Sequence, residues 1–420
     1  MKSLINRLSW VTVIFILSKS AVFITPLLLS NHVSLLIYGR IELALAIGSI
    51  FAIIIGLGLP GAVPYYLIKK NQSEYLSSFT MHALVLCCIT ILFGGLHYIV
   101  SLDPVFALSL VAGCLFAIQI LRSSIYKVQS APSKASITES GVYLTILTWV
   151  GVAILFNQDI TIENILLVLL VYTSILIFIC YSNFIKSYQQ SCEWSEFKSN
   201  YVSAIKFGFP LIFASFFMLL LANSGRLIVG YWLSTEDVGI YSFFFRLAAA
   251  VLLLYQLIVI AFFNKIYRAE GIDLDRIIMI IMLLVGAGSL LLIYIGPIIL
   301  PSFFTLMSKY GQEYQTVYRL FSIQMVFWVG IALTELIIYR SELGSRLVII
   351  LLADVVVLVL VVTLLDLFGR FNLKSFAWTH MVILFGAFLL QANLLWKERI
   401  KLPSAIKVAF ITLLAIPIII

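Results

Sequence analysis

The sequence has few charged residues. Only 11% of its 420 residues are charged, whereas 62% are hydrophobic, and the mean hydropathy is +1.12. Soluble domains carry about 25% charged residues. Apolar runs of about 20 residues, long enough to cross a bilayer core as a helix, recur along the whole chain. This composition excludes an ordinary soluble domain and predicts an all-α, polytopic membrane protein.

The sequence also lacks the common catalytic and metal-binding motifs. It contains no phosphate-binding GxxxxGK[ST] loop, no HExxH and no GxSxG. The five cysteines do not show metal-ligand spacing, and the four histidines are isolated from one another. We therefore expect neither an enzyme nor a bound cofactor. The net charge is +8, but no basic run exceeds two adjacent residues, so we expect no nucleic-acid partner.

Twelve apolar segments predict transmembrane helices. A thirteenth, residues 404–420, is long enough either to span marginally or to lie at the interface. The first span follows Lys2 and Arg7 and is too long for the apolar region of a signal peptide. The predicted spans are 9–30, 40–66, 79–101, 104–126, 138–156, 162–185, 204–233, 238–263, 276–298, 316–339, 347–366 and 375–396.

Lysine and arginine are distributed unevenly between the two sides of this predicted topology. Most of them lie at the N-terminus and in the connections that follow even-numbered spans. Cytoplasmic loops of membrane proteins carry an excess of basic residues. The distribution therefore predicts a cytoplasmic N-terminus.

The chain divides into two similar halves. A polar connection at 186–203 separates six spans from six, and predicts lobes at 1–203 and 204–397 with an extra apolar segment at 398–420. The sequence "LLIYGRIELA" at 35–44 resembles "TEDVGIYSFF" at 235–244, with Gly39 and Gly239 in corresponding places. Duplicated halves are typical of transporters that bind substrate between them. We expect two pseudo-symmetric six-helix lobes around a central cavity.

Three cations lie inside predicted spans: Arg246, Arg226 and Lys19. An arginine at the centre of a membrane helix costs about 2.5–3.5 kcal/mol on insertion scales, and Arg246 lies about 13 Å below the outer turn by helical rise. Guanidinium groups suit phosphate oxygens, so a lipid-linked phosphate or pyrophosphate fits such a site. The alternative is pairing with a buried carboxylate or with backbone carbonyls.

Three acidic residues within the spans are candidates for either role. Asp354 lies deep inside its span, where it would bind H⁺ or Na⁺ and couple transport to an ion gradient, or would pair with a polar neighbour. Glu335 and Glu42 lie nearer the ends of their spans. Each of the three is also a potential partner for Arg246.

Glycine and proline interrupt two spans. "GLGLPGAVP" at 56–64 lies near the cytoplasmic end of the second span, and "FGFP" at 207–210 lies early in the seventh. Proline removes a helix hydrogen bond and bends the helix. These segments predict either bends used in rocking between inward- and outward-open states or simple helix packing.

Residues 204–254, 38–67 and 342–380 resemble bacterial polysaccharide and O-antigen flippases of the multidrug/oligosaccharidyl-lipid/polysaccharide exporter superfamily. The resemblance implies a protein of the bacterial inner membrane that moves an oligosaccharide on undecaprenyl pyrophosphate by alternating access. Arg246, Arg226 and Lys19 would then neutralise the pyrophosphate. Membrane lipids, a polysaccharide polymerase and chain-length machinery are the implied partners.

The sequence departs from the family at one position, and it offers three aromatic residues as further candidates for substrate contact. The family usually has an Asp-Arg pair where this chain has Gly225 before Arg226. The aromatic residues Tyr241, Phe244 and Phe245 are candidates for contacts with sugar or lipid, although packing is the commoner role of such residues.

Two alternatives stay open at this point. The first is a drug/cation antiporter of the same superfamily, although organic cations would favour an acidic cavity rather than a basic one. The second is an integral-membrane glycan polymerase or ligase, which generally needs a sizeable outer loop that this chain lacks. The sequence does not distinguish the O-antigen from the capsule or exopolysaccharide pathway.

Overall fold

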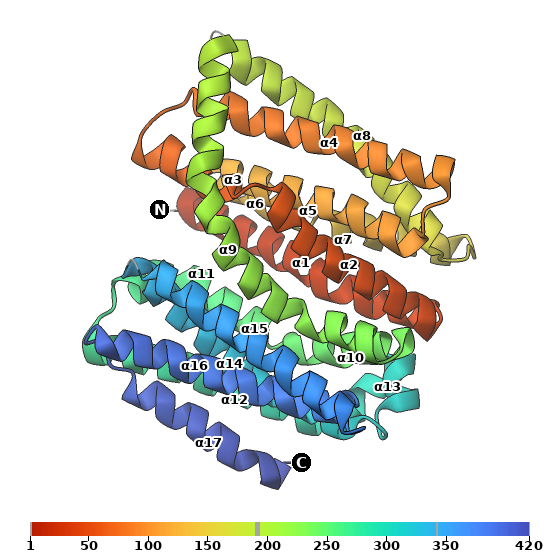
Figure 1. Ribbon diagram of the computed structural model, residues 1–420, viewed down its shortest axis with the longest axis vertical. Helices are drawn as coiled ribbons and strands as arrows, with labels where there is room; N and C mark the ends of the chain where they lie inside the picture. The colour runs from red at the N-terminus through yellow and green to blue at the C-terminus, as the bar shows by residue number, and fades with distance from the viewer. Residues whose placement is uncertain (1, 190–193, 342, 420) are drawn as a thin grey trace. The chain divides into compact units, whose positions relative to one another are not determined.

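The computed structural model describes residues 2–189, 194–341 and 343–419 (Figure 1). Regular secondary structure in these ranges is entirely helical, as predicted. Contacts within the chain define two compact units, Met1–Leu219 and Leu220–Ile420. The predicted boundaries at 203 and 397 and the central cavity between lobes stay predictions.

The N-terminal unit contains eight helices, a π-helical turn and the first part of a long helix that continues into the C-terminal unit. Its elements are α1 (Lys2–His32), α2 (Leu35–Ile55), α3 (Leu59–Pro64), η1 (Tyr65–Lys69), α4 (Tyr75–Val100), α5 (Pro104–Val128), α6 (Pro132–Glu139), α7 (Gly141–Leu155), α8 (Ile162–Gln189) and the start of α9 (Trp194–Trp232).

The C-terminal unit contains the rest of α9 and the remaining helices. They are α10 (Thr235–Ala249), α11 (Leu252–Arg268), α12 (Gly271–Ile299), η2 (Leu300–Ser302), α13 (Thr305–Tyr310), α14 (Gln315–Arg340), α15 (Gly344–Leu367), α16 (Leu373–Lys397) and α17 (Pro403–Ile419). The last of these forms a helix of 17 residues, which is near the lower limit for a span.

The number of spans is compatible with the prediction of twelve. Among the described residues, nine helices are long and apolar enough to cross a membrane, and the number reaches 12 if each of three bent pairs forms one span. The bends are 61° between α6 and α7, 42° within α9 and 43° between α10 and α11. Pro210 lies inside α9, before this bend, and its missing N–H removes a hydrogen bond from the helix.

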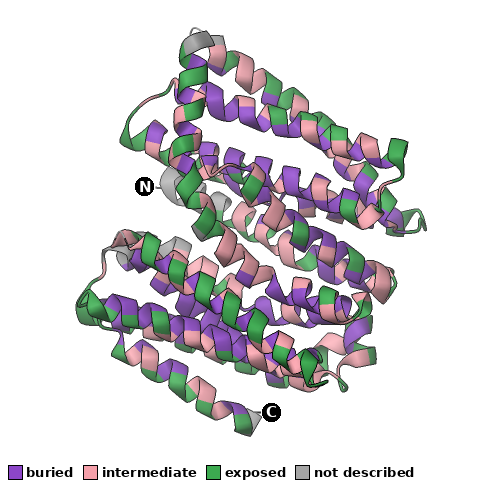
Figure 2. Ribbon diagram, in the orientation of Figure 1, coloured by how far each residue is buried: buried purple, intermediate pink, exposed green. Residues whose placement is uncertain are grey.

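Each unit is built around one helix with most of its surface buried. In the N-terminal unit this helix is α5, which packs against α2, α4, α6 and α8; in the C-terminal unit it is α14, which packs against α10, α12, α16 and α17. Small residues permit the close approach of α5 to α2, since a Cβ on Gly48 would lie 2.8 Å from the Ser109 carbonyl oxygen. Such contacts are typical of membrane helix pairs. Other helices carry both buried and exposed residues (Figure 2).

The predicted internal repeat is visible in local structure. Helices α1 and α9 end at His32 and Trp232, 200 residues apart, and the following helices begin at Leu35 and Thr235. Both following helices have a serine N-cap, Ser34 or Ser234, whose hydroxyl accepts a backbone N–H. The two halves therefore use the same turn and cap at equivalent positions.

The connection predicted at 186–203 is shorter than expected. Helix α8 continues to Gln189 and α9 begins at Trp194, so most of this polar segment is helical. A helix extends beyond the bilayer at little cost because its backbone hydrogen bonds are internal. Cys192, which belongs to this connection, lies outside the described residues.

The two glycine-proline segments contact each other within the N-terminal unit. The first interrupts the second span between α2 and α3, where Gly58 has φ +66°. A Cβ on Gly208 of α9 would lie 2.7 Å from the Leu57 carbonyl oxygen and 2.8 Å from the Gly58 carbonyl carbon. The backbones therefore touch at this point, and the glycines serve packing as well as bending.

We expect Gly208→Ala to lower the free energy of unfolding by about 1–3 kcal/mol, the usual cost of overpacking. The added methyl group meets backbone atoms, which cannot move aside as a flexible side chain does. The melting temperature of the purified protein in detergent measures this effect. Gly151→Ala in α7 is the control, because a Cβ at that position would meet nothing within 4 Å. Equal melting temperatures for both variants would contradict the backbone contact.

Candidate functional site

Arg246 lies in α10 of the C-terminal unit, one turn before the helix ends. The helix begins with a capping box in which Ser234 and Asp237 satisfy each other's backbone N–H groups, and this fixes its start firmly. By helical rise, Arg246 lies about 16 Å from that start. Its side chain is only 7% exposed. The structure thus buries the guanidinium near the middle of a span, where an uncompensated charge is costly.

Arg226 approaches the same face of α10 from α9. Its Nε donates to the Ser242 hydroxyl at 3.2 Å, and one terminal nitrogen donates to Asn223 Oδ1 at 3.1 Å. The guanidinium also lies over the Phe245 ring at 5.7 Å. Three neutral side chains therefore contact Arg226: an amide, a hydroxyl and an aromatic ring.

The two arginines belong to one region of the C-terminal unit. Ser242, which contacts Arg226, precedes Arg246 by four residues, and side chains four apart lie on the same helix face. Both arginines are buried to a similar extent, 8% and 7% exposed. The arrangement places two guanidinium groups, which keep their charge at any physiological pH, in the buried part of one unit.

The glycine that replaces the family's aspartate has a structural reason. Tyr241 is 1% exposed, stacks on Phe245, and is enclosed by Phe321 and Phe376. A Cβ on Gly225 would lie 2.0 Å from Tyr241 Cζ. The tyrosine ring therefore occupies the space that an aspartate side chain would need.

Two of the three aromatic candidates for sugar contact are buried, and Phe245 is half-buried. Tyr241 and Phe244 are each 1% exposed in the core of the C-terminal unit. Phe245 stacks on Tyr241 and lies beneath the Arg226 guanidinium. Phe245 is therefore the ring of the three that contacts Arg226, and contacts of the three with sugar or lipid stay a prediction.

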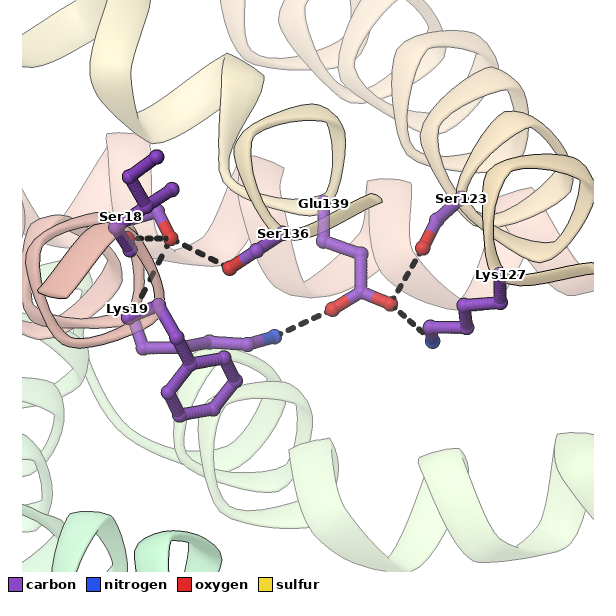
Figure 3. A network of polar contacts seen from close by, with 8 residues as sticks. Ser18, Lys19, Ser123, Lys127, Ser136 and Glu139 are labelled. Carbon is purple, nitrogen blue, oxygen red and sulfur yellow. Dashed lines mark hydrogen bonds and ion pairs between the residues drawn. The ribbon is translucent and has the colours of Figure 1, made fainter. Parts of the chain in front are cut away.

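Lys19 lies in the N-terminal unit within a network of polar side chains (Figure 3). Its Nζ lies 2.6 Å from Glu139 Oε2. The other carboxylate oxygen of Glu139 accepts from Ser123 at 2.7 Å and pairs with Lys127. Next to this pair, Ser18 and Ser136 share a hydrogen bond of 2.6 Å. The network ties α1, α5 and α6 together.

This network reduces the charge that Lys19 offers to a ligand. One glutamate lies between two lysines, so the three side chains carry a net charge of about +1 rather than +2. The sequence pointed to Glu42, Glu335 and Asp354 as potential partners for Arg246 and gave no sign of Glu139 as a partner for Lys19. Lys19 and Glu139 are 120 positions apart, and no spacing rule connects such positions.

The three candidate carboxylates lie apart from this network. Glu42 is 1% exposed in α2 of the N-terminal unit. Glu335 in α14 lies beside Tyr255 and Tyr339, and Asp354 is buried in α15. The Oδ2 atom of Asp354 has no hydrogen-bond partner within the described part of the chain. Glu42 thus belongs to the N-terminal unit and the other two to the C-terminal unit, and their role in ion coupling stays a prediction.

Residues 4–263, more than half of the chain, match the family model described as "Polysaccharide biosynthesis protein". The chain belongs to this family. The membership confirms the resemblance noted in the sequence, and together with the apolar spans it makes the chain a multi-pass membrane protein of polysaccharide biosynthesis. A comparison with curated proteins found no match.

Two solved structures are similar to the chain at low identity. The eukaryotic MATE transporter AtDTX14 is 12% identical with a TM-score of 0.45, over 97% of this chain and 98% of its own. The MATE multidrug transporter DinF-BH is 18% identical with a TM-score of 0.48, over 93% of both chains.

We expect Gly225→Ala to lower the melting temperature, because its methyl group would overlap the enclosed Tyr241 ring. The cost falls in the range of about 1–3 kcal/mol for overpacking. Gly386→Ala in α16 is the matched control, since a Cβ there would meet nothing within 4 Å. Combining Gly225→Ala with Tyr241→Leu should cost less than the sum of the single changes. Strict additivity would show that the ring does not occupy this space.

We expect Glu139→Gln to destabilise the protein by about 1–3 kcal/mol, because two lysines lose their carboxylate in a half-buried setting. Lys127→Gln should cost much less, since its side chain is 61% exposed and Lys19 keeps its partner. Thermal unfolding of the purified variants measures both. The exchange Lys19→Glu with Glu139→Lys should recover part of the loss. Equal losses for Glu139→Gln and Lys127→Gln would refute the network.

Proposed function

We propose that this protein is a flippase that moves an oligosaccharide linked to undecaprenyl pyrophosphate across the bacterial inner membrane. The observation that carries the proposal is the buried pair Arg226 and Arg246 within a membrane protein of the polysaccharide biosynthesis family. A pyrophosphate is the charged part of such a substrate. A hydrophobic barrier opposes its passage, and buried guanidinium groups lower that barrier.

The chemistry of arginine suits this task. The guanidinium stays charged at any physiological pH and presents several N–H donors in a planar fork that matches phosphate oxygens. Arg226 keeps its contacts with Asn223 and Ser242 through two of its nitrogens, so those neighbours hold the fork in place. A preorganised donor loses less conformational entropy when the anion binds.

The rest of the mechanism follows from the proposed cargo. The polyprenyl tail stays in the bilayer while the charged head passes between two alternately open states. Bends in α9 and between α10 and α11 provide points where helices change direction during this exchange. Asp354, Glu335 or Glu42 would couple the movement to H⁺ or Na⁺. A cytoplasmic N-terminus and association with a polymerase and chain-length machinery belong to the same proposal.

Flipping in proteoliposomes tests the proposal. Purified protein is reconstituted with a fluorescent polyprenyl-pyrophosphate oligosaccharide, and a membrane-impermeant quencher reports the outward-facing fraction. We expect Arg246→Ala and Arg226→Ala each to slow flipping by roughly tenfold or more, because each loses charge-assisted hydrogen bonds to the pyrophosphate. Arg246→Lys should retain part of the flipping rate, since it keeps the positive charge and loses only the planar set of N–H donors.

Arg346→Ala is the matched control in the same unit, because this arginine is 57% exposed and pairs with Glu398. It should flip at the wild-type rate. Wild-type flipping by Arg246→Ala and Arg226→Ala would remove both arginines from the site. Failure of the wild type with an imposed ion gradient, together with export of a cationic dye, would favour the antiporter over the flippase.

A further inference from the structure

The N-terminal unit contains a cavity that the proposed transport does not use. It has a volume of about 420 Å³ and lies among α4, α5, α6 and α8. A second cavity of about 450 Å³ continues from it between α5, α6, α7 and α8. The two share Arg122, Tyr126, Lys134 and Ile179. They form one continuous site, which we call the α5–α8 pocket.

The first part of the α5–α8 pocket is basic. Arg122, Lys134 and Lys186 line it, together with neutral polar groups such as Thr80 and Asn183, and none of the described residues that line it is acidic. These residues lie where α4 begins, α5 ends, α6 begins and α8 ends. The positive-inside prediction places that end of the unit at the cytoplasmic face.

Arg122 is buried among neutral groups. It is 7% exposed, and its guanidinium contacts the Tyr126 hydroxyl at 2.6 Å and the Cys180 sulfur at 3.7 Å. No carboxylate within the described ranges forms an ion pair with it. A buried cation without a counter-charge is costly, and an anion in the adjoining cavity would offset that cost.

The nearby acid Glu139 is directed elsewhere. It pairs with Lys19, Lys127 and Ser123. Ser123 and Lys127 share one face of α5, whereas Arg122 and Tyr126 lie on a face rotated by about 100°. The helix geometry thus places the Glu139 network of Figure 3 and the pocket residues Arg122 and Tyr126 on different faces of α5.

The second part of the α5–α8 pocket is largely apolar. Leu144, Leu176, Ile137 and Ile179 line it, and the two isoleucines are 48% and 37% exposed. Exposed apolar side chains are usual where a membrane helix faces hydrocarbon. A ligand in this pocket would therefore place a charged head against Arg122 and an alkyl chain along a surface open to the bilayer.

We infer that the α5–α8 pocket binds an anionic glycerophospholipid, with its phosphate held by Arg122, Lys134 and Lys186. Basic pockets between membrane helices at the cytoplasmic side bind anionic headgroups. All of its residues belong to one compact unit, so the site does not depend on movement between units. This supports a lipid that remains bound rather than a cargo that passes through. The inference does not rest on the proposed function.

Native mass spectrometry of the delipidated protein tests this site. Phosphatidylglycerol is added as the probe, with phosphatidylethanolamine as the matched lipid without net charge and glycerol phosphate as the soluble headgroup. We expect preferential retention of phosphatidylglycerol. The double variant Lys134→Gln, Lys186→Gln should weaken it by roughly thirtyfold, from the loss of two basic contacts. Both lysines are exposed, so this variant should fold.

Lys127→Gln is the matched control, because it removes one positive charge from α5 outside the pocket and should change retention by less than about twofold. Arg122→Gln should abolish the preference where the protein folds. Equal retention by the double variant and the wild type would overturn the site. So would tight binding of glycerol phosphate, which would indicate a free-phosphate site, or displacement of phosphatidylglycerol by polyprenyl pyrophosphate, which would indicate the carrier lipid instead.

Discussion

The cost of burying positive charge in an apolar bilayer governs the arrangement of this protein. The basic side chains in or near the membrane-spanning helices differ in the groups that contact them. Lys19 has a carboxylate in Glu139. Arg226 contacts an amide, a hydroxyl and an aromatic ring, and Arg122 contacts a hydroxyl and a sulfur. A carboxylate partner reduces the positive charge that a basic side chain offers to an anionic ligand.

Glycines allow segments of the chain to pack closely enough for these side-chain contacts to form. Gly58 and Gly208 allow two backbones to touch in the N-terminal unit, and Gly225 leaves room for the Tyr241 ring beside Arg226. In membranes, helices associate largely through close packing, because lipid is as apolar as the side chains. The packing of the Tyr241 ring therefore explains why a glycine precedes Arg226. Neutral groups on α9 and α10 contact the Arg226 guanidinium.

The proposed site and the α5–α8 pocket use the same chemistry for different purposes. Both present guanidinium groups to phosphate oxygens, but one is in the C-terminal unit and the other is inside the N-terminal unit. Transport requires that the affinity for the substrate falls as the protein changes conformation, because a ligand bound equally well in both conformations does not shift the equilibrium between them. A lipid held inside one unit has no such requirement and stabilises that unit by mass action.

The sequence alone determined the features that depend on neighbours along the chain. Hydropathy located the spans, glycine and proline predicted the interruption of the second span at 56–64, and the isolated charges singled out Arg226 and Arg246. Tertiary structure decided what such residues touch. It paired Lys19 with Glu139 across 120 positions, filled the space at Gly225 with Tyr241, and gave Arg122 a hydroxyl and a sulfur as neighbours. A local pattern measures the cost of burying a residue, whereas only the folded chain supplies the partner that offsets it.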